Sequence, residues 1–530
     1  MNCFAFLDKA ARYSPDRPAI VHGDVVWSYR EFRARALAIG GNLRALGCKP
    51  GDRIAFCLAN SPPILEIIYG CFAAGLVVVP INVRLHASEI AYILQNSGAR
   101  ALIYDAGHQE GIAAYSESIA GLDLRISISP ADGVLPYSAL LEPNRSLSSS
   151  ESVEADAICW LFYTSGTTGR PKGAIWNHGM LRAVVMNYLA DVYNIQPGET
   201  VLHAAPLSHG SGVVALPAVA RGATNLILPS ASFDPKTLFS TIQRFRVSHI
   251  AFLAPTQIIK MLEAFNEGEF DLSSLKAICY GGAPIYAEHL RMAVEAFGPV
   301  FTQIYGQGEA PMTIAGLNAN IHAVLLKTGD PRIGSAGQIR TDVEAICVGE
   351  NDTPLGSNQV GEVVVRGEVV MPGYWMDPVA TAEALRGGWL HTGDIGYFDE
   401  QGFLFLLDRA KDMIISGGNN IYPREVEEVI IQHSGVASVV VCGVPHAYWG
   451  EAVHAVIVTK AGVSLTAEEV IAHCARHIAG YKKPKSIEFV DSLPVNGYGK
   501  IMRREVRERY WQGLSARIGG GQVFRKDGIQ

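Results

Sequence analysis

The sequence lacks several patterns that mark common functional classes. It contains no long run of lysine or arginine, and its formal charge is −7, so nucleic acid is not expected as a partner. A Gly-x-Ser-x-Gly pattern is absent, which argues against serine hydrolases of that class. No Gly-x-Gly-x-x-Gly follows an expected strand, which argues against a nicotinamide-dependent enzyme, and the histidines lack zinc-site spacing. Internal repeats and coiled-coil heptads are also missing.

Paired cysteine motifs and a signal-like N-terminus are missing as well. The nine cysteines are scattered, several lie inside apolar runs, and none forms CxxC, which favours reduced core thiols in a cytoplasmic protein. The most apolar segment, residues 64–81, includes Glu66, Gly70 and Gly75. A helix of about 10–12 residues followed by a buried strand explains it better than a membrane span of about 20 residues. We therefore expect no membrane insertion.

What is present indicates a large α/β protein. A chain of 530 residues, with 48% hydrophobic residues and 54 glycines, is too long for one core and suggests at least two domains. Ser28 and Glu31 form a capping box that begins a helix, and Ser88 is expected to cap another helix. Expected strands at 53–58, 77–79 and 101–104 alternate with helices, which predicts parallel sheets with crossover helices.

The pattern changes in the second part of the chain. From about residue 330, short strands separated by turns predict a small β-rich subdomain, and from about residue 410 a compact α+β pattern follows. We therefore predict a large N-terminal domain, residues 1–410, with parallel-type sheets and this subdomain. A small α+β C-terminal domain, residues 411–530, follows it.

The central feature is the stretch Tyr163-Thr164-Ser165-Gly166-Thr167-Thr168-Gly169-Arg170-Pro171-Lys172-Gly173. Its hydroxyls, glycines and cations suit a loop that holds phosphate groups. It is not a Walker loop, because Pro171 separates Gly169 from Lys172 and a strand rather than a helix is expected to follow. A flexible Ser/Thr/Gly surface loop is the alternative.

Other polar turns are expected at strand ends, where open α/β sheets bind ligands. The segments 280–284 and 304–309 follow two strands and would form a slot for a flat ring, with Tyr305 available for stacking. Glu309 beside a polyphosphate would suit Mg²⁺. Asp394 lies in the turn His391-Thr392-Gly393-Asp394, and Lys500 lies between glycine and isoleucine far downstream. Each of these, taken alone, is also explained as an ordinary turn or a surface side chain.

Taken together and in this order, these motifs resemble the ATP-dependent adenylate-forming enzymes. That family includes acyl-CoA synthetases, the adenylation domains of peptide synthetases and firefly luciferase. The resemblance extends to about residue 510. It implies a two-step reaction, in which ATP and a carboxylate give an acyl adenylate and pyrophosphate, and a thiol then displaces AMP. ATP, Mg²⁺ and CoA are the implied ligands.

The resemblance also implies roles for individual residues. Lys500 would bridge the carboxylate and the α-phosphate, Glu309 would hold Mg²⁺, and His209 would lie at the mouth of the acyl pocket. The implied ATP-binding residues are Thr164, Ser165, Gly166, Thr167, Thr168, Gly169, Lys172, Gly281, Gly282, Ala283, Pro284, Tyr305, Gly306, Gln307, Gly308, Asp394 and Arg409. The implied acyl-pocket residues are Gly210, Ser211, Gly212 and Met312.

The C-terminal domain would rotate between the half-reactions about Lys411. The implied CoA-binding residues are Gly417, Gly418, Trp449, Tyr481, Lys483 and Lys485. The sequence departs from the family at Gly308, where a threonine usually precedes the magnesium glutamate. We expect backbone N–H groups or the acyl group to replace the missing hydroxyl.

The sequence identifies the carboxylic acid substrate less closely than it identifies the reaction. A dicarboxylate would need an arginine beside Tyr305, where Ile304 stands instead, so a medium- or long-chain fatty acid or an aromatic acid is favoured. The leading prediction is a carboxylic acid–CoA ligase. A stand-alone adenylation enzyme that loads a separate carrier protein and a non-catalytic nucleotide-binding homologue are the alternatives. The sequence is also compatible with a homodimer.

Overall fold

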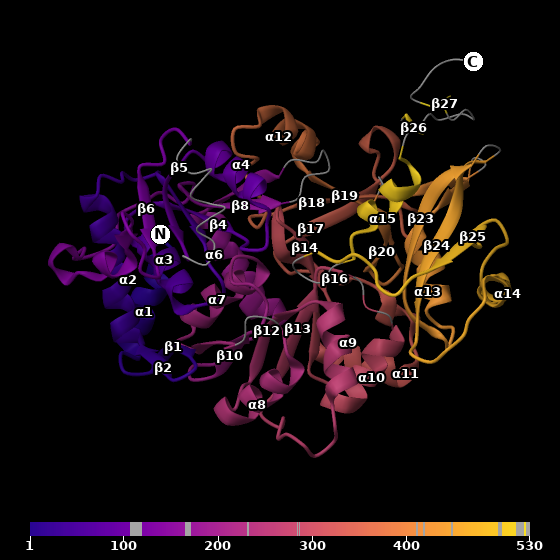
Figure 1. The fold of residues 1–530 in the computed structure, drawn as a ribbon, viewed down its shortest axis with the longest axis horizontal. Helices are drawn as coiled ribbons and strands as arrows, with labels where there is room; N and C mark the ends of the chain where they lie inside the picture. The colour runs from indigo at the N-terminus through magenta and orange to yellow at the C-terminus, as the bar shows by residue number, and fades with distance from the viewer. Residues whose placement is uncertain are drawn as a thin grey trace. The chain divides into compact units, whose positions relative to one another are not determined.

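Figure 1 shows the fold in a computed structural model. The structure describes residues 1–530 except 106–118, 165–170, 230–232, 284, 286, 410–411, 417–418, 447–448, 497–500, 513, 516–523 and 526–530. The chain divides into two compact units. Unit 1 contains residues 1–282, 293–345 and 365–391, and unit 2 contains residues 283–292, 346–364 and 392–530. The domain boundary expected near residue 410 remains a prediction.

Unit 1 contains the predicted parallel sheets. One sheet has the order β7-β6-β5-β3-β4-β8-β9, and its neighbours are parallel except β8 and β9. Its strands are β3 (Arg53–Cys57), β4 (Val77–Ile81), β5 (Ala99–Tyr104), β6 (Leu124–Ser127), β7 (Leu135–Pro136), β8 (Ile158–Thr164) and β9 (Lys172–Asn177). The fully buried β4 reads as a continuous apolar run, as parallel strands covered on both faces do.

The second run of strands in unit 1 has the order β16-β15-β14-β13-β12-β10-β11-β1-β2. The strands from β1 through β11, β10, β12 and β13 to β14 are parallel neighbours, while β2, β15 and β16 are antiparallel to theirs. The bounds are β1 (Pro18–His22), β2 (Val25–Ser28), β10 (Thr200–His203), β11 (Thr224–Ile227), β12 (His249–Leu253), β13 (Ala277–Gly281), β14 (Phe301–Gln307), β15 (Ala310–Gly316) and β16 (Gly337–Ile339).

Helices connect these strands. They are α1 (Phe4–Tyr13), α2 (Tyr29–Ala45), α3 (Pro62–Ala73), α4 (Ala87–Ser97), α6 (His178–Asn187), α7 (Gly210–Ala220), α8 (Pro235–Phe245), α9 (Pro255–Ala264), α11 (Ala319–Thr328) and α12 (Pro378–Ala384), with α10 (Ala287–Phe297) divided between the units. The capping box of Ser28 and Glu31 begins α2, as predicted. The expected cap at Ser88 is wrong, because α4 begins directly after His86. The His86 backbone N–H donates to the Glu89 carboxylate, and its ring accepts from the Ser88 N–H.

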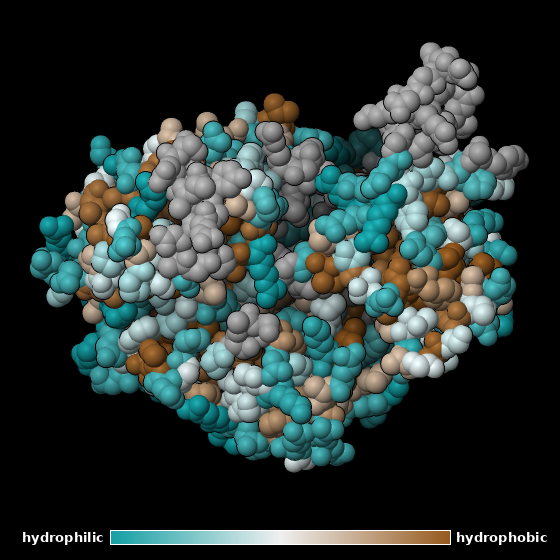
Figure 2. All heavy atoms as spheres, in the orientation of Figure 1, coloured by the Kyte–Doolittle hydropathy of each residue, from teal (hydrophilic) through white to brown (hydrophobic). Residues whose placement is uncertain are grey.

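The apolar segment 64–81 folds as predicted, into most of α3 and the strand β4, and its side chains are buried. In the part of the chain that the structure describes, no helix is both long and apolar enough to span a membrane. On the face shown in Figure 2, hydrophilic and hydrophobic residues are intermixed. The exposed apolar side chains include Met376 and Val379 at α12, each 78% exposed.

Unit 2 holds most of the strand run β17-β18-β19-β20 and a second sheet of order β22-β21-β24-β23, with β25 paired to β24. The bounds are β17 (Glu344–Val348), β18 (Gly361–Arg366), β19 (Leu390–Phe398), β20 (Phe403–Arg409), β21 (Ile414–Ser416), β22 (Asn419–Ile421), β23 (Val436–His446), β24 (Gly450–Thr459), β25 (Ser486–Phe489), β26 (Leu514–Ser515) and β27 (Phe524–Arg525). The helices α13 (Pro423–Ile430), α14 (Ala467–His477) and α15 (Arg503–Tyr510) complete it. A buried cluster that includes Ile414, Val426, Val453 and Val470 forms its core.

Candidate functional site

The predicted phosphate loop leaves one strand and enters the next. β8 ends at Thr164 and β9 begins at Lys172, and these two residues are directly paired in antiparallel register. The two strands predicted to flank the loop are thus confirmed, and a sheet fixes their paired ends. The candidate residues Ser165, Gly166, Thr167, Thr168 and Gly169, with Arg170, lie outside the described residues.

The two strands expected to form a ring slot are neighbours. β13 and β14 are parallel, and Gly281 pairs with Ile304, so Gly282 and Tyr305 follow at adjacent strand positions. Gly282 has φ +76°, a left-handed conformation that glycine adopts without strain. Ala283 belongs to unit 2, and Pro284 lies outside the described residues.

The strand that contains Tyr305 is longer than predicted. β14 continues through Gly306 to Gln307, and β15 begins at Ala310, so Gly308 and Glu309 form the turn of a hairpin. The turn is held at two points, because the Trp176 indole Nε1 donates to the Gly308 carbonyl (2.7 Å) and the Met371 N–H donates to the Glu309 carbonyl (2.8 Å). The hairpin thus places the Gly308–Glu309 turn beside β9, the strand that follows the phosphate loop.

The space beside Gly308 is filled, which explains the departure from the family. A Cβ at this position would lie 2.2 Å from Thr164 Cγ2 and 2.9 Å from Phe162 Cδ1, well inside van der Waals contact. The φ angle of Gly308 is not in the left-handed region, so the restriction is steric. The methyl group of Thr164 therefore occupies the volume that a side chain at 308 would need.

The Phe162 ring lies in a stack of three aromatic side chains. It stacks nearly parallel to Trp176 (centroids 4.7 Å apart, 10° between planes) and also stacks on His209 (4.9 Å, 26°). Offset stacking of this kind contributes about 0.5–1.5 kcal/mol per pair beyond area burial. His209 precedes α7 and is half-buried, so the stack fixes a histidine at the start of the helix that carries the predicted acyl-pocket residues.

Gly210, a predicted acyl-pocket residue, and Gly282, a predicted ATP-binding residue, both lie beside an aromatic ring that sequence reasoning missed. A Cβ on Gly210 would lie 3.9 Å from Met312 Sδ and 4.0 Å from Phe252 Cγ, and a Cβ on Gly282 would lie 3.4 Å from Phe252 Cζ. Phe252 is half-buried in β12, whose other residues are buried. Met312 has φ +63°, a strained conformation of a kind that clusters at functional sites.

Two further acyl-pocket candidates lie inside the packed helix. Ser211 is fully buried, and its hydroxyl pairs with His203 Nδ1 at 2.9 Å. Burial lowers the pKa of His203 to about 4, so the imidazole stays neutral near pH 7. Gly212 approaches a backbone closely, since a Cβ there would lie 2.0 Å from the Leu207 carbonyl oxygen. These contacts fix the start of α7 against β10 and the segment that joins them.

Tyr374 is a second residue that sequence reasoning missed. Its hydroxyl donates to Glu309 Oε1 at 2.6 Å, and Lys172 Nζ lies 5.2 Å from the centre of its ring. It thus contacts both the predicted magnesium ligand and the predicted phosphate-binding lysine. No local pattern in Pro372-Gly373-Tyr374-Trp375 indicates these contacts.

In unit 2, the predicted ribose-binding residues are brought together. Asp394 on β19 pairs directly with Arg409 on β20. Asp394 is buried, and its N–H donates to Thr392 Oγ1, whose hydroxyl in turn donates to the Val363 carbonyl. The backbone around Asp394 is therefore held in place. The Arg409 side chain lies outside the described part of the structure.

Trp449 and Lys485, two of the predicted CoA-binding residues, lie near the start of β24. Trp449, 41% exposed, immediately precedes β24, and the Lys485 N–H donates to the Val453 carbonyl four positions later (2.8 Å). At about 3.3 Å per strand residue, the two positions are about 13 Å apart along the strand. Tyr481 is exposed and Lys483 is half-buried in the preceding turn.

The predicted hinge Lys411, the glycines Gly417 and Gly418, and the predicted catalytic Lys500 lie outside the described residues. The chain on either side of Lys500 is anchored. Val495 and Ile501 form a β-bridge, and the Met502 N–H donates to the Pro494 carbonyl.

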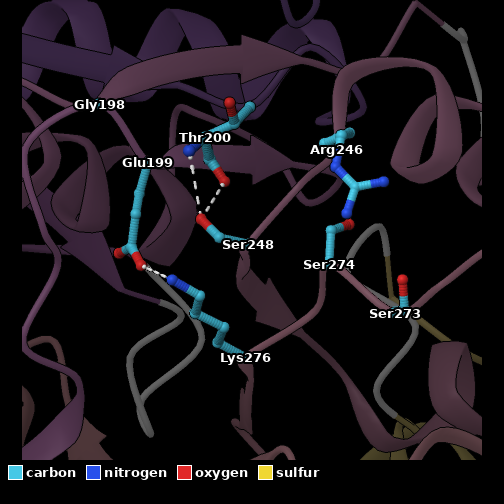
Figure 3. Close-up of a pocket in the computed structure, with 8 residues that line it drawn as sticks. All are labelled: Gly198, Glu199, Thr200, Arg246, Ser248, Ser273, Ser274 and Lys276. Carbon is cyan, nitrogen blue, oxygen red and sulfur yellow. Dashed lines mark hydrogen bonds and ion pairs between the residues drawn. The ribbon is translucent and has the colours of Figure 1, made fainter.

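A polar pocket of about 330 Å³ lies in unit 1 at the amino ends of the parallel strands β10, β12 and β13 (Figure 3). Lys276 points toward Glu199 and forms a 2.8 Å ion pair with it, while the Ser248 hydroxyl bonds the Thr200 backbone. These residues stand at the starts of β10, β12 and β13. Because open α/β sheets bind ligands at the carboxyl ends of their strands, this pocket is not the candidate site.

Comparison with protein families decides the relationship. Residues 7–375 match the AMP-binding enzyme family, and residues 425–500 match the AMP-binding enzyme C-terminal domain. The chain belongs to the AMP-binding enzyme family. The predicted adenylate-forming superfamily and two-domain α/β fold are thereby confirmed.

Relatives of this AMP-binding enzyme match over nearly its whole length. A feruloyl-CoA synthase of Amycolatopsis is 40% identical over 95% of this chain and 98% of the relative. A medium/long-chain-fatty-acid–CoA ligase of Mycobacterium tuberculosis is 31% identical over 96% of this chain and 90% of the relative. The crystal structure of an anthranilate CoA ligase in complex with anthranoyl-AMP aligns with a TM-score of 0.88 and 25% identity, covering 96% and 97% of the two chains.

Proposed function

We propose that the protein activates an aromatic carboxylic acid of the phenylpropenoic type with ATP and transfers the acyl group to CoA. The reaction class is carboxylic acid–CoA ligase, an acid–thiol ligase that forms AMP. The single observation that carries the choice of acid is the half-buried Phe252 ring beside Gly210 and Gly282, with Met312 next to Gly210. A flat ring, a thioether and two positions without side chains suit a planar aromatic group.

The similarity to a feruloyl-CoA synthase supports this choice, because the acid in that name is an aromatic phenylpropenoic acid. The 31% identical fatty-acid ligase keeps a medium- or long-chain fatty acid as the second candidate. Ile304, buried and apolar beside Tyr305, agrees with a monocarboxylate of either kind.

In the first step, two anions must meet. Thr164 and Lys172 at the ends of the phosphate loop would bind the pyrophosphate portion of ATP, and the β13–β14 slot with Tyr305 would take the adenine. In unit 2, Asp394 and Arg409 would bind the ribose. Lys500 would neutralise the carboxylate and the α-phosphate as they approach, and losing such a group typically costs about 10²–10³ in rate.

Mg²⁺ fits the residues beside the phosphate loop. Within the described ranges, no cluster of three or more His, Cys, Asp or Glu side chains could hold a metal ion. Mg²⁺ needs no such cluster here, because it is usually bound by one or two carboxylates together with substrate phosphates. Glu309 would supply the carboxylate, and the ion would neutralise phosphate charge when bound.

In the second step, CoA must reach the acyl adenylate. Trp449 and Lys485 at one end of β24 would bind the CoA nucleotide by stacking and by charge, with Tyr481 and Lys483 in the same turn. Rotation about Lys411 would exchange Lys500 for this surface between the two half-reactions.

The test is pyrophosphate release with a panel of acids, with and without CoA. We expect 4-hydroxycinnamates to be used with kcat/KM at least tenfold above decanoate, and acyl-CoA to form. Phe252→Leu should lower kcat/KM for cinnamates about tenfold and leave KM for ATP unchanged. Phe245→Leu, at the end of α8, is the control variant. A preference for decanoate would refute the aromatic acid and favour a fatty acid as the substrate. Turnover only with a carrier protein would refute CoA as the acyl acceptor.

A further inference from the structure

One tyrosine connects two residues that the proposed function uses, one in the β14–β15 turn and the other at the start of β9. Tyr374 Oη donates to Glu309 Oε1 at 2.6 Å, and its ring face lies 5.2 Å from Lys172 Nζ. A hydrogen bond to a carboxylate is charge-assisted, and a lysine ammonium within about 6 Å of a ring centre is attracted by the ring. Tyr374 therefore restricts an anion and a cation at once.

The backbone around Tyr374 is itself held between these partners. The Met371 N–H donates to the Glu309 carbonyl (2.8 Å), and the Trp375 N–H donates to the Gly173 carbonyl (2.8 Å). The Tyr374 N–H is bonded to Thr381 Oγ1 at 2.9 Å. The segment 371–375 is thus fastened to the Gly308–Glu309 turn at one end and to β9 at the other.

This geometry leaves a defined part of the Glu309 carboxylate for a cation. The tyrosine hydroxyl occupies Oε1, so it fixes the rotation of the carboxyl group and orients Oε2. The ring limits where the Lys172 ammonium can go, because the ammonium moves on a flexible four-carbon chain that would otherwise sample many rotamers. Holding both charges in place before ATP arrives reduces the ordering that binding must bring about.

We propose that Tyr374 is a positioning residue that aligns Glu309 for the metal ion and Lys172 for the phosphates of ATP. The proposal rests on the proposed roles of Glu309 and Lys172. Tyr374 itself touches neither substrate nor metal in this assignment. Its hydroxyl acts through Glu309, and its ring acts through Lys172.

Two variants separate these actions. Tyr374→Phe removes only the hydroxyl, and Tyr374→Leu also removes the ring. Binding of Mn²⁺ to the ATP-loaded protein, followed by electron paramagnetic resonance, reports on Glu309. Affinity for metal-free ATP, measured by calorimetry in EDTA, reports on Lys172.

We expect Tyr374→Phe to weaken Mn²⁺ binding about tenfold, as the loss of a hydrogen bond to a charged group does, and to leave the affinity for metal-free ATP within twofold. Tyr374→Leu should weaken Mn²⁺ binding equally and also weaken ATP binding about two- to fivefold. Tyr193→Phe is the matched control, because the Tyr193 hydroxyl donates to Glu199 (3.0 Å) at the far end of the strands. That variant should change neither quantity.

The outcomes distinguish this proposal from the proposed function. If Glu309→Gln abolishes Mn²⁺ binding while Tyr374→Phe leaves it unchanged, the positioning role is refuted and the role of Glu309 stands. If Glu309→Gln leaves Mn²⁺ binding unchanged and Lys172→Ala leaves ATP binding unchanged, the proposed function of this site is refuted, and the positioning role with it. Should Tyr374→Leu not fold, the comparison of Tyr374→Phe with Tyr193→Phe decides the question.

Discussion

Replacing Gly308 with threonine restores the residue that the family usually has there, yet the structure predicts that this change lowers activity. The first added atom, Cβ, would stand 2.2 Å from Thr164 Cγ2 and 2.9 Å from Phe162 Cδ1. Carbon atoms in favourable contact are about 3.5–4.0 Å apart, so Thr164 has to move by more than 1 Å. Thr164 ends β8 at the phosphate loop, and Phe162 stacks on His209, so both movements reach the site.

The size of the effect follows from these contacts. Inserting extra atoms into a packed site costs about 1–3 kcal/mol, and disturbing an aromatic stack costs about 0.5–1.5 kcal/mol. If a cost of about 1.4 kcal/mol or more falls on the catalytically competent arrangement, kcat/KM decreases at least about tenfold. Gly308→Ala should already show most of the loss, because Cβ is the atom that meets Thr164.

Pyrophosphate release with a saturating acid measures the effect, and a double variant identifies its cause. Thr164→Ser removes Cγ2 and keeps the hydroxyl, so Gly308→Ala combined with Thr164→Ser should recover most of the activity lost in Gly308→Ala. Gly334→Ala is the control, since no atom lies within 4 Å of a Cβ there and its φ is not left-handed. Activity of Gly308→Thr at or above wild type would refute the steric explanation. If the double variant is no more active than Gly308→Ala, the Thr164 methyl group is not the cause of the loss.

Three further predictions concern other parts of the chain. Lys500→Ala should abolish adenylation and retain thioester formation from preformed acyl adenylate; equal loss in both assays would contradict its assigned role. Trp449→Ala should raise the apparent KM for CoA several-fold, and an unchanged KM would remove this indole from the CoA site. The free energy of unfolding, measured by urea titration, should fall as pH decreases from about 6.5 toward 4. Burial lowers the pKa of His203, His249 and His322 to about 4, 3 and 4, so the unfolded chain binds protons that the folded chain does not. Each histidine adds a slope of up to about 1.4 kcal/mol per pH unit, and an unchanged slope in His203→Gln would exclude its contribution.

Much of the fold around the candidate site was predictable because its signals are local. The capping box of Ser28 and Glu31 located the start of α2, and the apolar run after Pro62 separated correctly into α3 and β4. The hydroxyls, glycines and Lys172 between two strands predicted the phosphate loop and the AMP-binding family. Capping, hydrophobic periodicity and loop chemistry each depend on a few neighbouring residues, which one sequence displays.

The sequence by itself determined the family and the list of chemically suitable residues, whereas the tertiary structure decided how they are held. Tyr374 and Glu309 are 65 positions apart, and the Trp176 indole reaches the Gly308 carbonyl over 132 positions. The missing side chain at Gly308 looked like a lost hydroxyl in the sequence, and only the packing of Thr164 against it showed a steric cause. Such contacts depend on which strands become neighbours and which side chains fill the space between them, and neither follows from patterns of adjacent residues.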